Sequence, residues 1–401
     1  MLSVHSCPLG KLGAENTGGM SVYIRELARE LGKRGHWVDI FTRIHEPIHD
    51  QIVELAKNVR LIHFKAGEEE ERNKLALYPR LAEFAREVEN FRKHNGLWYD
   101  LIHSHYWLSG WVGKWTQQWW DIPHITTFHS LGAIKNAIGT RVDEPELRIN
   151  CEKMLINVCQ RSIALSEREK EDLIHYYDAS PKTISVVPCG VNLDLFKPID
   201  KKIARRLLGF DGDSIILFVG RIVPLKGIEK LLMAIPYIIQ KQRLKLAVIG
   251  GDEHSQAEVE RLKSLSRSLN INDSVAFLGL VKQDILPYFY SAANVCVVPS
   301  YYESFGLVAL ESLACGTPVV ATRVGGMKSI IRQGETGYVV EDNTPQRLAD
   351  KIALLLSTSK PDEEVTRSIR ATVTQFCWSN IAESIGKEYE MVLRNYVSKR
   401  K

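Results

Sequence analysis

Short apolar runs rich in β-branched residues alternate with amphipathic helical stretches along all 401 residues, and this alternation constrains the fold more than any other feature. The pattern is typical of parallel βαβ units, whose strands are buried on both faces. In the first half we expect strands at residues 2–5, 37–42, 61–64, 101–103, 124–128, 162–165 and 184–187. In the second half we expect them at residues 215–219, 245–250, 275–278, 294–298, 319–322 and 338–340. Each set is the size of one doubly wound domain.

The domain boundary is marked by Pro and Gly residues clustered at 188–198, after the last strand of the first set. We predict an N-terminal domain of residues 1–193, completed by residues 375–401, and a second domain of residues 194–374. A last helix, Ile381 to about Val397, has apolar residues at helical spacing and no strand after it, so we expect it to pack across the boundary. Two facing domains of this kind place the carboxyl ends of both sheets along one cleft. Residues 1–5 read as the back half of a strand, which predicts a few further residues upstream.

The charge balance excludes some classes of protein. With 52 basic and 48 acidic residues, the formal charge of +4 is too small for a protein that neutralises many phosphates of a nucleic acid. Seven cysteines without a CxxC pair are typical of a reducing compartment, so we expect a cytoplasmic protein. No apolar run approaches the roughly 18–20 residues that span a bilayer, so we expect no membrane association. A homodimer remains open.

The first candidate motif is a glycine pair, Gly18-Gly19, which follows the first predicted strand and opens a helix. Glycines there let an anionic ligand approach backbone N–H groups at the positive end of the helix dipole. The chain has no GxGxxG sequence, which argues against a dinucleotide fingerprint. A plain tight turn is the alternative explanation.

The second motif is the loop at residues 220–227, directly after the strand at 215–219. Arg221 and Lys226 lie five residues apart in this loop, between Gly and Pro residues. Two cations at the carboxyl end of a strand can bind one diphosphate. Two ordinary basic residues in a solvated loop are the alternative.

The third motif, residues 300–311, is the most specific, and it again links a strand to a helix. Glu303 lies in the turn, where its carboxylate can accept hydrogen bonds from sugar hydroxyls. Gly306 allows close approach of the backbone, and the N–H groups of residues 304–308 are the unpaired donors of the helix start. Glu311, eight residues after Glu303, can hold a ribose diol.

Together, Gly18-Gly19, Arg221 with Lys226, and Glu303 with Glu311 resemble the retaining GT-B glycosyltransferases of glycosyltransferase family 4, which includes sucrose synthases and sucrose-phosphate synthases. The resemblance covers nearly the whole chain. Within the family it is strongest to the inositol-phosphate N-acetylglucosaminyltransferases of mycothiol synthesis, through residues 103–110 and 184–187. It implies an α/β GT-B fold with an acceptor-binding first domain and a second domain that binds the nucleotide sugar.

The resemblance also assigns roles to residues. Arg221 and Lys226 would bind the diphosphate of a UDP-sugar, Glu303 the hexose, and His129 would lie near the sugar C6; these four form the expected catalytic set. The expected donor-binding residues are Gly18, Gly19, Ser304, Phe305, Gly306, Leu307, Val308 and Glu311. Two side-chain cations and helix N-termini can stabilise departing UDP, so we expect no metal and no cofactor besides the UDP-sugar. The one D-x-D sequence, at residues 211–213, precedes a strand and is interpreted as a surface loop.

Retention without an evident carboxylate nucleophile favours a front-face route. In this route the acceptor hydroxyl attacks on the side from which UDP leaves, and the departing phosphate takes the proton. The protein then contributes positioning and charge stabilisation rather than a general base.

The resemblance further implies that Lys74, Tyr106, Ser130 and Arg148 bind the phosphate of an inositol-phosphate acceptor. Lys135, in the segment 133–136, could join them, and Ser21 is a further expected acceptor-binding residue. Ser21 stands where the related enzyme has Asn, and the glycine pair is followed by Met rather than the Gln of sucrose-phosphate synthases. The acceptor therefore stays open between a phosphorylated polyol and the fructose or fructose 6-phosphate of sucrose and sucrose-phosphate synthases. A nucleotide-sugar epimerase is a further alternative, and a non-catalytic sensor is disfavoured by the complete charged set.

Four tryptophans recur at every fourth residue, Trp107, Trp111, Trp115 and Trp119. This spacing makes a slowly drifting stripe on one helix face. Core or interface packing is the favoured interpretation, with acceptor stacking or contact with a membrane surface as the alternatives.

Overall fold

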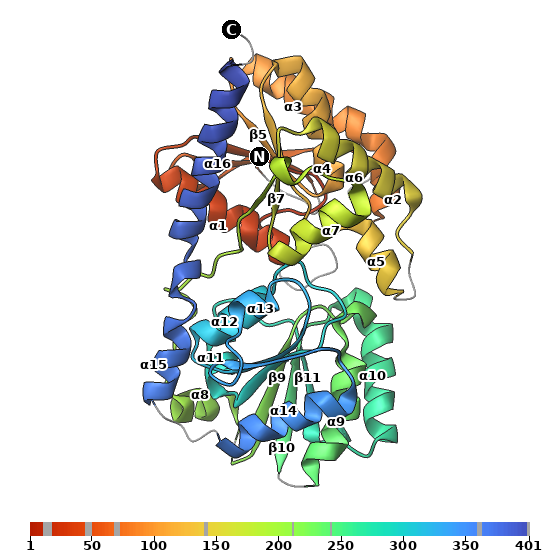
Figure 1. Ribbon diagram of the computed structural model, residues 1–401, viewed down its shortest axis with the longest axis vertical. Coiled ribbons are helices and arrows are strands. Elements are labelled where there is room, and N and C mark those ends of the chain that lie inside the picture. Colours follow the sequence, from red (N-terminus) through yellow and green to blue (C-terminus); the bar gives the residue numbers. More distant parts are fainter. Residues whose placement is uncertain are drawn as a thin grey trace. The chain divides into compact units, whose positions relative to one another are not determined.

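The computed structural model describes residues 1–10, 18–44, 50–67, 73–139, 143–210, 212–240, 243–358 and 363–398. The chain forms two compact units (Figure 1). The first unit comprises Met1–Gly10, Gly19–Pro188 and Trp378–Lys401, and the second comprises Lys11–Gly18 and Cys189–Cys377. The predicted boundaries, 193/194 and 374/375, lie five and three residues from these divisions. Asp211 of the D-x-D sequence lies outside the described residues.

The first unit is built on a sheet of order β3-β4-β2-β1-β5-β6-β7-β8, as far as the chain is described. Every strand pair is parallel except β3 with β4. The strands are β1 Leu2–Ser3, β2 Val38–Arg43, β3 Ile52–Ala56, β4 Val59–Phe64, β5 Ile102–His105, β6 His124–Thr127, β7 Arg161–Ala164 and β8 Ile184–Val186. All seven strands predicted in this half are present. Strand β3 was missed because it is a largely exposed edge strand with no continuous apolar run.

The second unit has a wholly parallel sheet of order β11-β10-β9-β12-β13-β14 among its described residues. Its strands are β9 Ser214–Val219, β10 Leu244–Ile249, β11 Val275–Gly279, β12 Val295–Val298, β13 Val319–Thr322 and β14 Gly337–Val340. All six predicted strands are confirmed. The core lies between this sheet and α9 with α14, which pack side by side.

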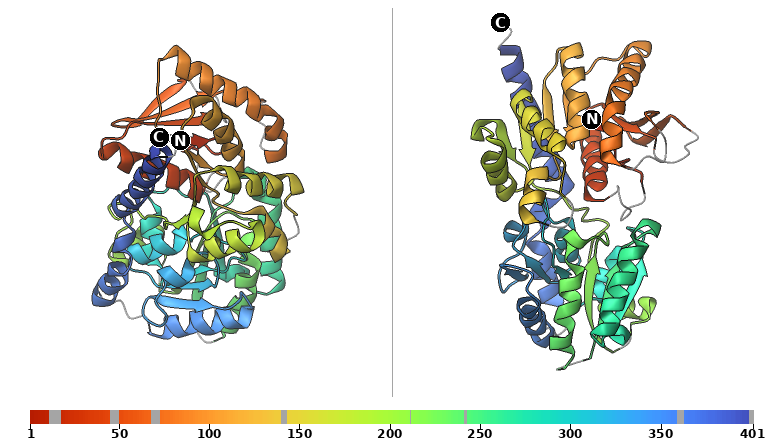
Figure 2. Two further views of the ribbon diagram at one scale, coloured as in Figure 1. Left: turned by 45° about the horizontal axis from the view of Figure 1, so that its top comes forward. Right: turned by 90° about the vertical axis from the view of Figure 1, so that its right-hand side faces the viewer.

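Helices cover both faces of the sheet in each unit (Figure 2). In the first unit they are α1 Gly19–Lys33, α2 Lys74–Leu77, α3 Leu81–His94, α4 Trp107–Trp120, α5 Gly132–Ile138, α6 Glu146–Val158, α7 Glu167–Tyr177 and α16 Trp378–Ser398. In the second they are α8 Lys201–Leu208, α9 Ile228–Ile239, α10 Gln256–Ser268, α11 Leu286–Ala292, α12 Leu307–Ala314, α13 Met327–Ile330, α14 Pro345–Thr358 and α15 Glu363–Ala371. None of the described helices is long and apolar enough to cross a bilayer.

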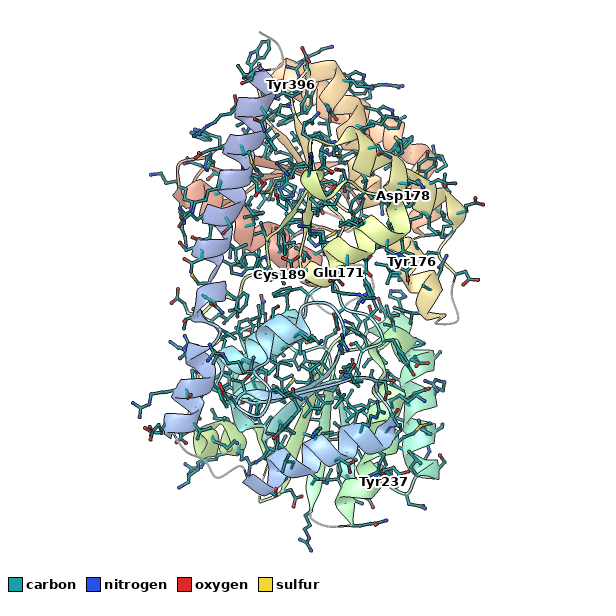
Figure 3. The ribbon with its side chains drawn as sticks, viewed as in Figure 1. Glu171, Tyr176, Asp178, Cys189, Tyr237 and Tyr396 are labelled. Carbon is teal, nitrogen blue, oxygen red and sulfur yellow. The ribbon has the colours of Figure 1, made fainter. Side chains whose placement is uncertain are left out.

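The last helix, α16, belongs to the first unit, although it follows the second unit in sequence. It packs beside α1, as Figure 1 shows in dark blue and red. Ile381, Ile385 and Val392 are buried along this helix, as the apolar spacing predicted. Near its end the hydroxyl of Tyr396, labelled in Figure 3, donates to Asp121 Oδ1 at 3.0 Å.

The tryptophan stripe lies on α4, and the exposure of its side chains increases toward the end of the helix. Trp107 is fully buried and stacks on Tyr78, whose ring centroid lies 5.8 Å away. Trp111 also contacts Tyr78, whereas Trp119 is half exposed. Core packing therefore accounts for the start of the stripe.

Candidate functional site

In the second unit, the loop after β9 and the loop after β12 are held against each other. Lys226 ends a 3₁₀ turn (Pro224–Lys226), and Gly227 follows with φ of +67°. A Cβ at Gly227 would lie 2.1 Å from the carbonyl oxygen of Pro299, so only glycine fits this contact. The N–H of Tyr301 donates to the Leu225 carbonyl at 2.9 Å. These contacts bring the predicted cationic loop to the predicted glutamate loop.

Glu303 and Lys226 form an ion pair at this junction. The Nζ of Lys226 lies 2.5 Å from Glu303 Oε1, and the Oγ of Ser300 donates to the same oxygen at 2.8 Å. Thr322 at the end of β13 donates to the Ser300 carbonyl and fixes the loop. Both charged side chains remain partly exposed. The structure therefore places two of the predicted catalytic residues in direct contact, with Arg221 in the same loop as Lys226.

The Glu303 loop is backed by a second glycine pair that sequence reasoning did not single out. Gly325 has φ of +52°, and a Cβ there would lie 2.5 Å from the carbonyl oxygen of Glu303. The N–H of Gly326 donates to the Phe305 carbonyl at 2.9 Å. Because both glycines contact the backbone of the Glu303 loop, they fix the position of that loop.

The predicted donor-binding segment runs into α12. Gly306 precedes the helix with φ of +124°, and Leu307 and Val308 form its first turn. Phe305 is buried, with its ring centroid 6.1 Å from that of Phe376, so only its backbone can contact a ligand. Ser304 lies between Glu303 and this buried ring.

Glu311 lies further along α12, and its side chain is buried. Its Oε2 accepts a hydrogen bond of 2.7 Å from the hydroxyl of Tyr290 on α11. Burial raises the pKa of Glu311 to about 7, although the Tyr290 hydrogen bond lowers it. Glu311, the residue predicted to bind the ribose, therefore holds its proton to a higher pH than an exposed glutamate does.

In the first unit, four predicted acceptor residues meet around one aromatic ring. The guanidinium of Arg148 on α6 lies 4.8 Å from the ring centroid of Tyr106, and the Nζ of Lys74 lies 5.6 Å from it. The Nη2 of Arg148 donates to the carbonyl oxygen of Ser130 at 2.8 Å and to its Oγ at 3.0 Å. Segments far apart in the sequence thus converge on Tyr106 and Arg148.

Two carboxylates that sequence reasoning missed complete this cluster. Glu144 accepts from Lys135 Nζ at 2.6 Å and forms an ion pair with Arg148, whose Nη1 lies 2.8 Å from Glu144 Oε2. Glu152 accepts from Arg148 Nε at 2.7 Å. Glu152 lies four residues after Arg148 on α6, and this i, i+4 spacing of opposite charges was a signal in the sequence, whereas Glu144 precedes the helix.

Tyr106 and His129 share an unusual backbone conformation. They follow the neighbouring strands β5 and β6, and their φ values are +77° and +59°. Left-handed backbone at residues other than glycine is costly and concentrates at functional sites. The Nε2 of His129 lies 3.0 Å from His105 Nδ1, and burial lowers the pKa of His129 to about 3. Both imidazoles are therefore neutral at physiological pH.

The remaining predicted residues lie at the start of α1. Among the described residues, a Cβ at Gly18 would meet no atom within 4 Å. Gly19 is the first residue of the helix. Ser21 is buried, and its Oγ lies 2.7 Å from the Oγ of Ser6. Its role as an acceptor residue stays a prediction.

The described residues contain no group of three His, Cys, Asp or Glu side chains that could hold a metal ion. The cationic groups around Glu303 in the second unit and around Tyr106 in the first unit are lysine and arginine side chains. Such groups bind phosphates through charge-assisted hydrogen bonds.

The chain is similar to known proteins over nearly its whole length. Residues 17–195 match the family model described as Glycosyltransferase Family 4, and residues 200–372 match Glycosyl transferases group 1. The D-inositol 3-phosphate glycosyltransferase of Corynebacterium diphtheriae is 38% identical over 398 residues, which cover 97% of this chain and 93% of that protein.

Two solved structures are similar along almost the whole chain. Sucrose-phosphate synthase from Thermosynechococcus elongatus has a TM-score of 0.91 at 34% identity over 98% of each chain. The Anabaena protein HepE in complex with UDP-glucose has a TM-score of 0.74 at 18% identity, covering 98% of this chain and 100% of that one, which is a likeness of fold alone. The predicted α/β GT-B architecture is confirmed.

Proposed function

Because the chain belongs to glycosyltransferase family 4, we propose that it moves a hexose or N-acetylhexosamine from a UDP-sugar to an inositol phosphate. The observation that carries the acceptor class is the cluster of Lys74, Ser130, Lys135 and Arg148 beside Tyr106 in the first unit. Several cationic donors from separate segments are what a phosphate monoester requires. The curated relative named above acts, by its name, on D-inositol 3-phosphate.

The donor proposal is supported by the residues of the second unit. Lys226 and Arg221 supply charge for a diphosphate, and the buried carboxylate of Glu311 can accept from a ribose hydroxyl. Lys226 is paired with Glu303. A diphosphate that engages Lys226 would release Glu303 to accept hydrogen bonds from the hexose hydroxyls.

The reaction is proposed to proceed with retention and without a metal ion. The acceptor hydroxyl forms a bond to the sugar C1 on the face from which UDP departs, while the bond from C1 to the phosphate oxygen breaks. The hydroxyl proton passes to that departing oxygen. Lys226 and Arg221 stabilise the negative charge that develops on UDP, and the protein otherwise contributes positioning.

A second candidate is transfer of glucose to fructose 6-phosphate. The similarity to sucrose-phosphate synthase at 34% identity over 98% of each chain favours it, and a sugar phosphate would suit the same cationic cluster. The two candidates differ in the acceptor ring and share the donor chemistry.

A substrate panel tests the proposal. UDP- and GDP-sugars are each combined with inositol 3-phosphate, inositol 1-phosphate, fructose 6-phosphate and fructose, and nucleotide release is measured. We expect release with a UDP-sugar and an inositol phosphate, and an α-configured donor should give an α-configured product by NMR. Release with fructose 6-phosphate alone would select the second candidate. Deuterium uptake from solvent into the sugar without any acceptor would instead indicate an epimerase.

Arg148→Ala separates the acceptor site from the donor site. We expect the KM for a phosphorylated acceptor to rise at least tenfold, because a charge-assisted donor is lost. Slow hydrolysis of the UDP-sugar in the absence of acceptor should stay near the wild-type rate. Equal losses in both reactions would refute the acceptor assignment.

A further inference from the structure

Glu144 occupies the position between two of the cations proposed for the acceptor phosphate. Its two oxygens divide between them, Oε1 at 2.6 Å from Lys135 Nζ and Oε2 at 2.8 Å from Arg148 Nη1. Its backbone is fixed to α5, because its N–H donates to Asn136 Oδ1 at 2.6 Å and Asn136 Nδ2 donates to its carbonyl at 2.9 Å. Burial raises the pKa of Glu144, but the charges of Arg148 and Lys135 outweigh this and lower it to about 2. The residue is therefore a carboxylate at every physiological pH.

The donors of Arg148 show where a phosphate can reach this side chain. Its Nε donates to Glu152, and its Nη2 donates to the carbonyl and hydroxyl oxygens of Ser130. The side chain is only 1% exposed. Of the five N–H groups of a guanidinium, these contacts use three, and the Nη1 edge is the one that faces Glu144. A phosphate that binds Arg148 must therefore approach at the edge that Glu144 covers.

The two carboxylates on Arg148 differ in how easily they can leave. Glu152 is wholly buried, and it also accepts from the N–H of Gly132 at 2.9 Å and from the hydroxyl of Tyr177. Glu144 is 21% exposed at the end of a loop. Removing Glu152 would leave several buried donors without an acceptor, whereas Glu144 can turn into solvent and be hydrated.

We propose that Glu144 is a built-in stand-in for the acceptor's phosphate, and that a phosphate monoester must displace it in order to bind. This inference rests on the proposed function, since it concerns the acceptor site of the proposed glycosyltransferase. A phosphate dianion returns the charge that Arg148 and Lys135 lose when Glu144 leaves. A neutral polyol returns none, so Glu144 stays in place and the site rejects it. Glu144 thereby converts the charge of the acceptor into specificity, at the expense of some affinity.

The test compares Glu144→Gln with the matched control Glu146→Gln. Glu146 is the exposed first residue of α6, and its replacement removes the same charge two residues away. Binding of inositol 1-phosphate and of inorganic phosphate is measured by isothermal titration calorimetry. Because a partly exposed ion pair contributes about 1 kcal/mol, we expect E144Q to bind both ligands about fivefold more tightly than wild type. The E146Q dissociation constants should stay within about twofold of wild type.

The outcomes separate this inference from the proposed function. If wild type binds inositol 1-phosphate and E144Q binds it no more tightly than E146Q does, the stand-in role is refuted and the acceptor class stands. If neither wild type nor E144Q binds a phosphorylated ligand, the acceptor class fails and the inference fails with it.

Thermal unfolding distinguishes a specific loss of the counter-ion from a general loss of stability in the variant. Glu144→Ala should lower the Tm, because Arg148 and Lys135 lose a shared counter-ion. Millimolar inorganic phosphate should raise this Tm by more than it raises that of wild type or Glu146→Ala, since the anion replaces the missing carboxylate. An equal phosphate effect on all three proteins would overturn the proposal.

Discussion

Glu152→Gln should destabilise the first unit strongly, although the change replaces one oxygen by an amide of nearly the same size. The carboxylate accepts from Arg148 Nε at 2.7 Å, from Gly132 N–H at 2.9 Å and from the Tyr177 hydroxyl. Both Arg148 and Glu152 are buried. The amide nitrogen of Gln must face Arg148 or Gly132, so one buried donor loses its acceptor whichever way the amide turns.

The magnitude follows from these contacts. Breaking a buried ion pair from one side costs about 3–5 kcal/mol, and we expect the loss to lie within this range because Glu144, 2.8 Å from Arg148, compensates only part of the remaining charge. The unmatched donor is part of that cost, since leaving a buried N–H without a partner costs about 1–3 kcal/mol. For a unit of this size the Tm should fall by about 6–20 °C.

Tryptophan fluorescence is the appropriate assay, because all eight tryptophans of the chain lie in the first unit. Urea unfolding followed by this emission reports that unit alone. Glu146→Gln on the exposed face of α6 is the control and should change the free energy of unfolding by less than about 0.5 kcal/mol. Combining Glu152→Gln with Arg148→Met should cost less than the sum of the single changes. A loss below about 1 kcal/mol for Glu152→Gln, or strict additivity, would refute the reasoning.

Four further predictions concern the second unit. Burial raises the pKa of Glu311 to about 7, so between about pH 4.5 and 7 the folded state holds more protons than the unfolded state. The free energy of unfolding therefore falls as the pH rises through this range, and calorimetry should show a smaller fall for Glu311→Gln. UDP affinity should weaken below pH 7 as this carboxylate is protonated, and Glu311→Gln should abolish that pH dependence in titration calorimetry. Gly325→Ala should lower kcat/KM at least tenfold with little change in circular dichroism, because its Cβ would lie 2.5 Å from the Glu303 carbonyl; unchanged kinetics would contradict this. Lys226→Ala should lower kcat/KM at least a hundredfold, whereas Lys282→Ala on an exposed loop should have no effect.

The regular elements could be predicted because buried parallel strands leave a strong signal. Continuous β-branched runs such as residues 215–219 and 319–322 are bounded by glycine and proline, and each proved to be a strand. Strand β3 gave no such signal, because it is a partly exposed edge strand paired antiparallel with β4 through a turn at Asn58. Whether such a segment forms an edge strand depends on pairing with the neighbouring strand more than on its own composition.

The cationic residues of the two candidate sites could be predicted from the sequence, but the carboxylates that pair with them in the first unit could not. Arg148, Lys135 and Lys226 follow motifs or a family resemblance, whereas Glu144 and Glu152 carry no motif. Their roles depend on the loop conformation before α6 and on burial beside Tyr177, and neither follows from spacing. The left-handed backbone of Tyr106 and His129 is likewise a property of the folded chain.

The two cationic clusters share one feature, which would allow a nearly neutral protein to present the proposed phosphate sites. Lys226 is neutralised by Glu303, and Arg148 with Lys135 is neutralised by Glu144. Clustered cations without counter-ions would repel one another and would attract any anion in solution. A resident carboxylate removes both problems, because phosphate binding then becomes an exchange of one anion for another. Affinity is set by the difference between two anions, so a doubly charged phosphate succeeds where a singly charged carboxylate ligand does not.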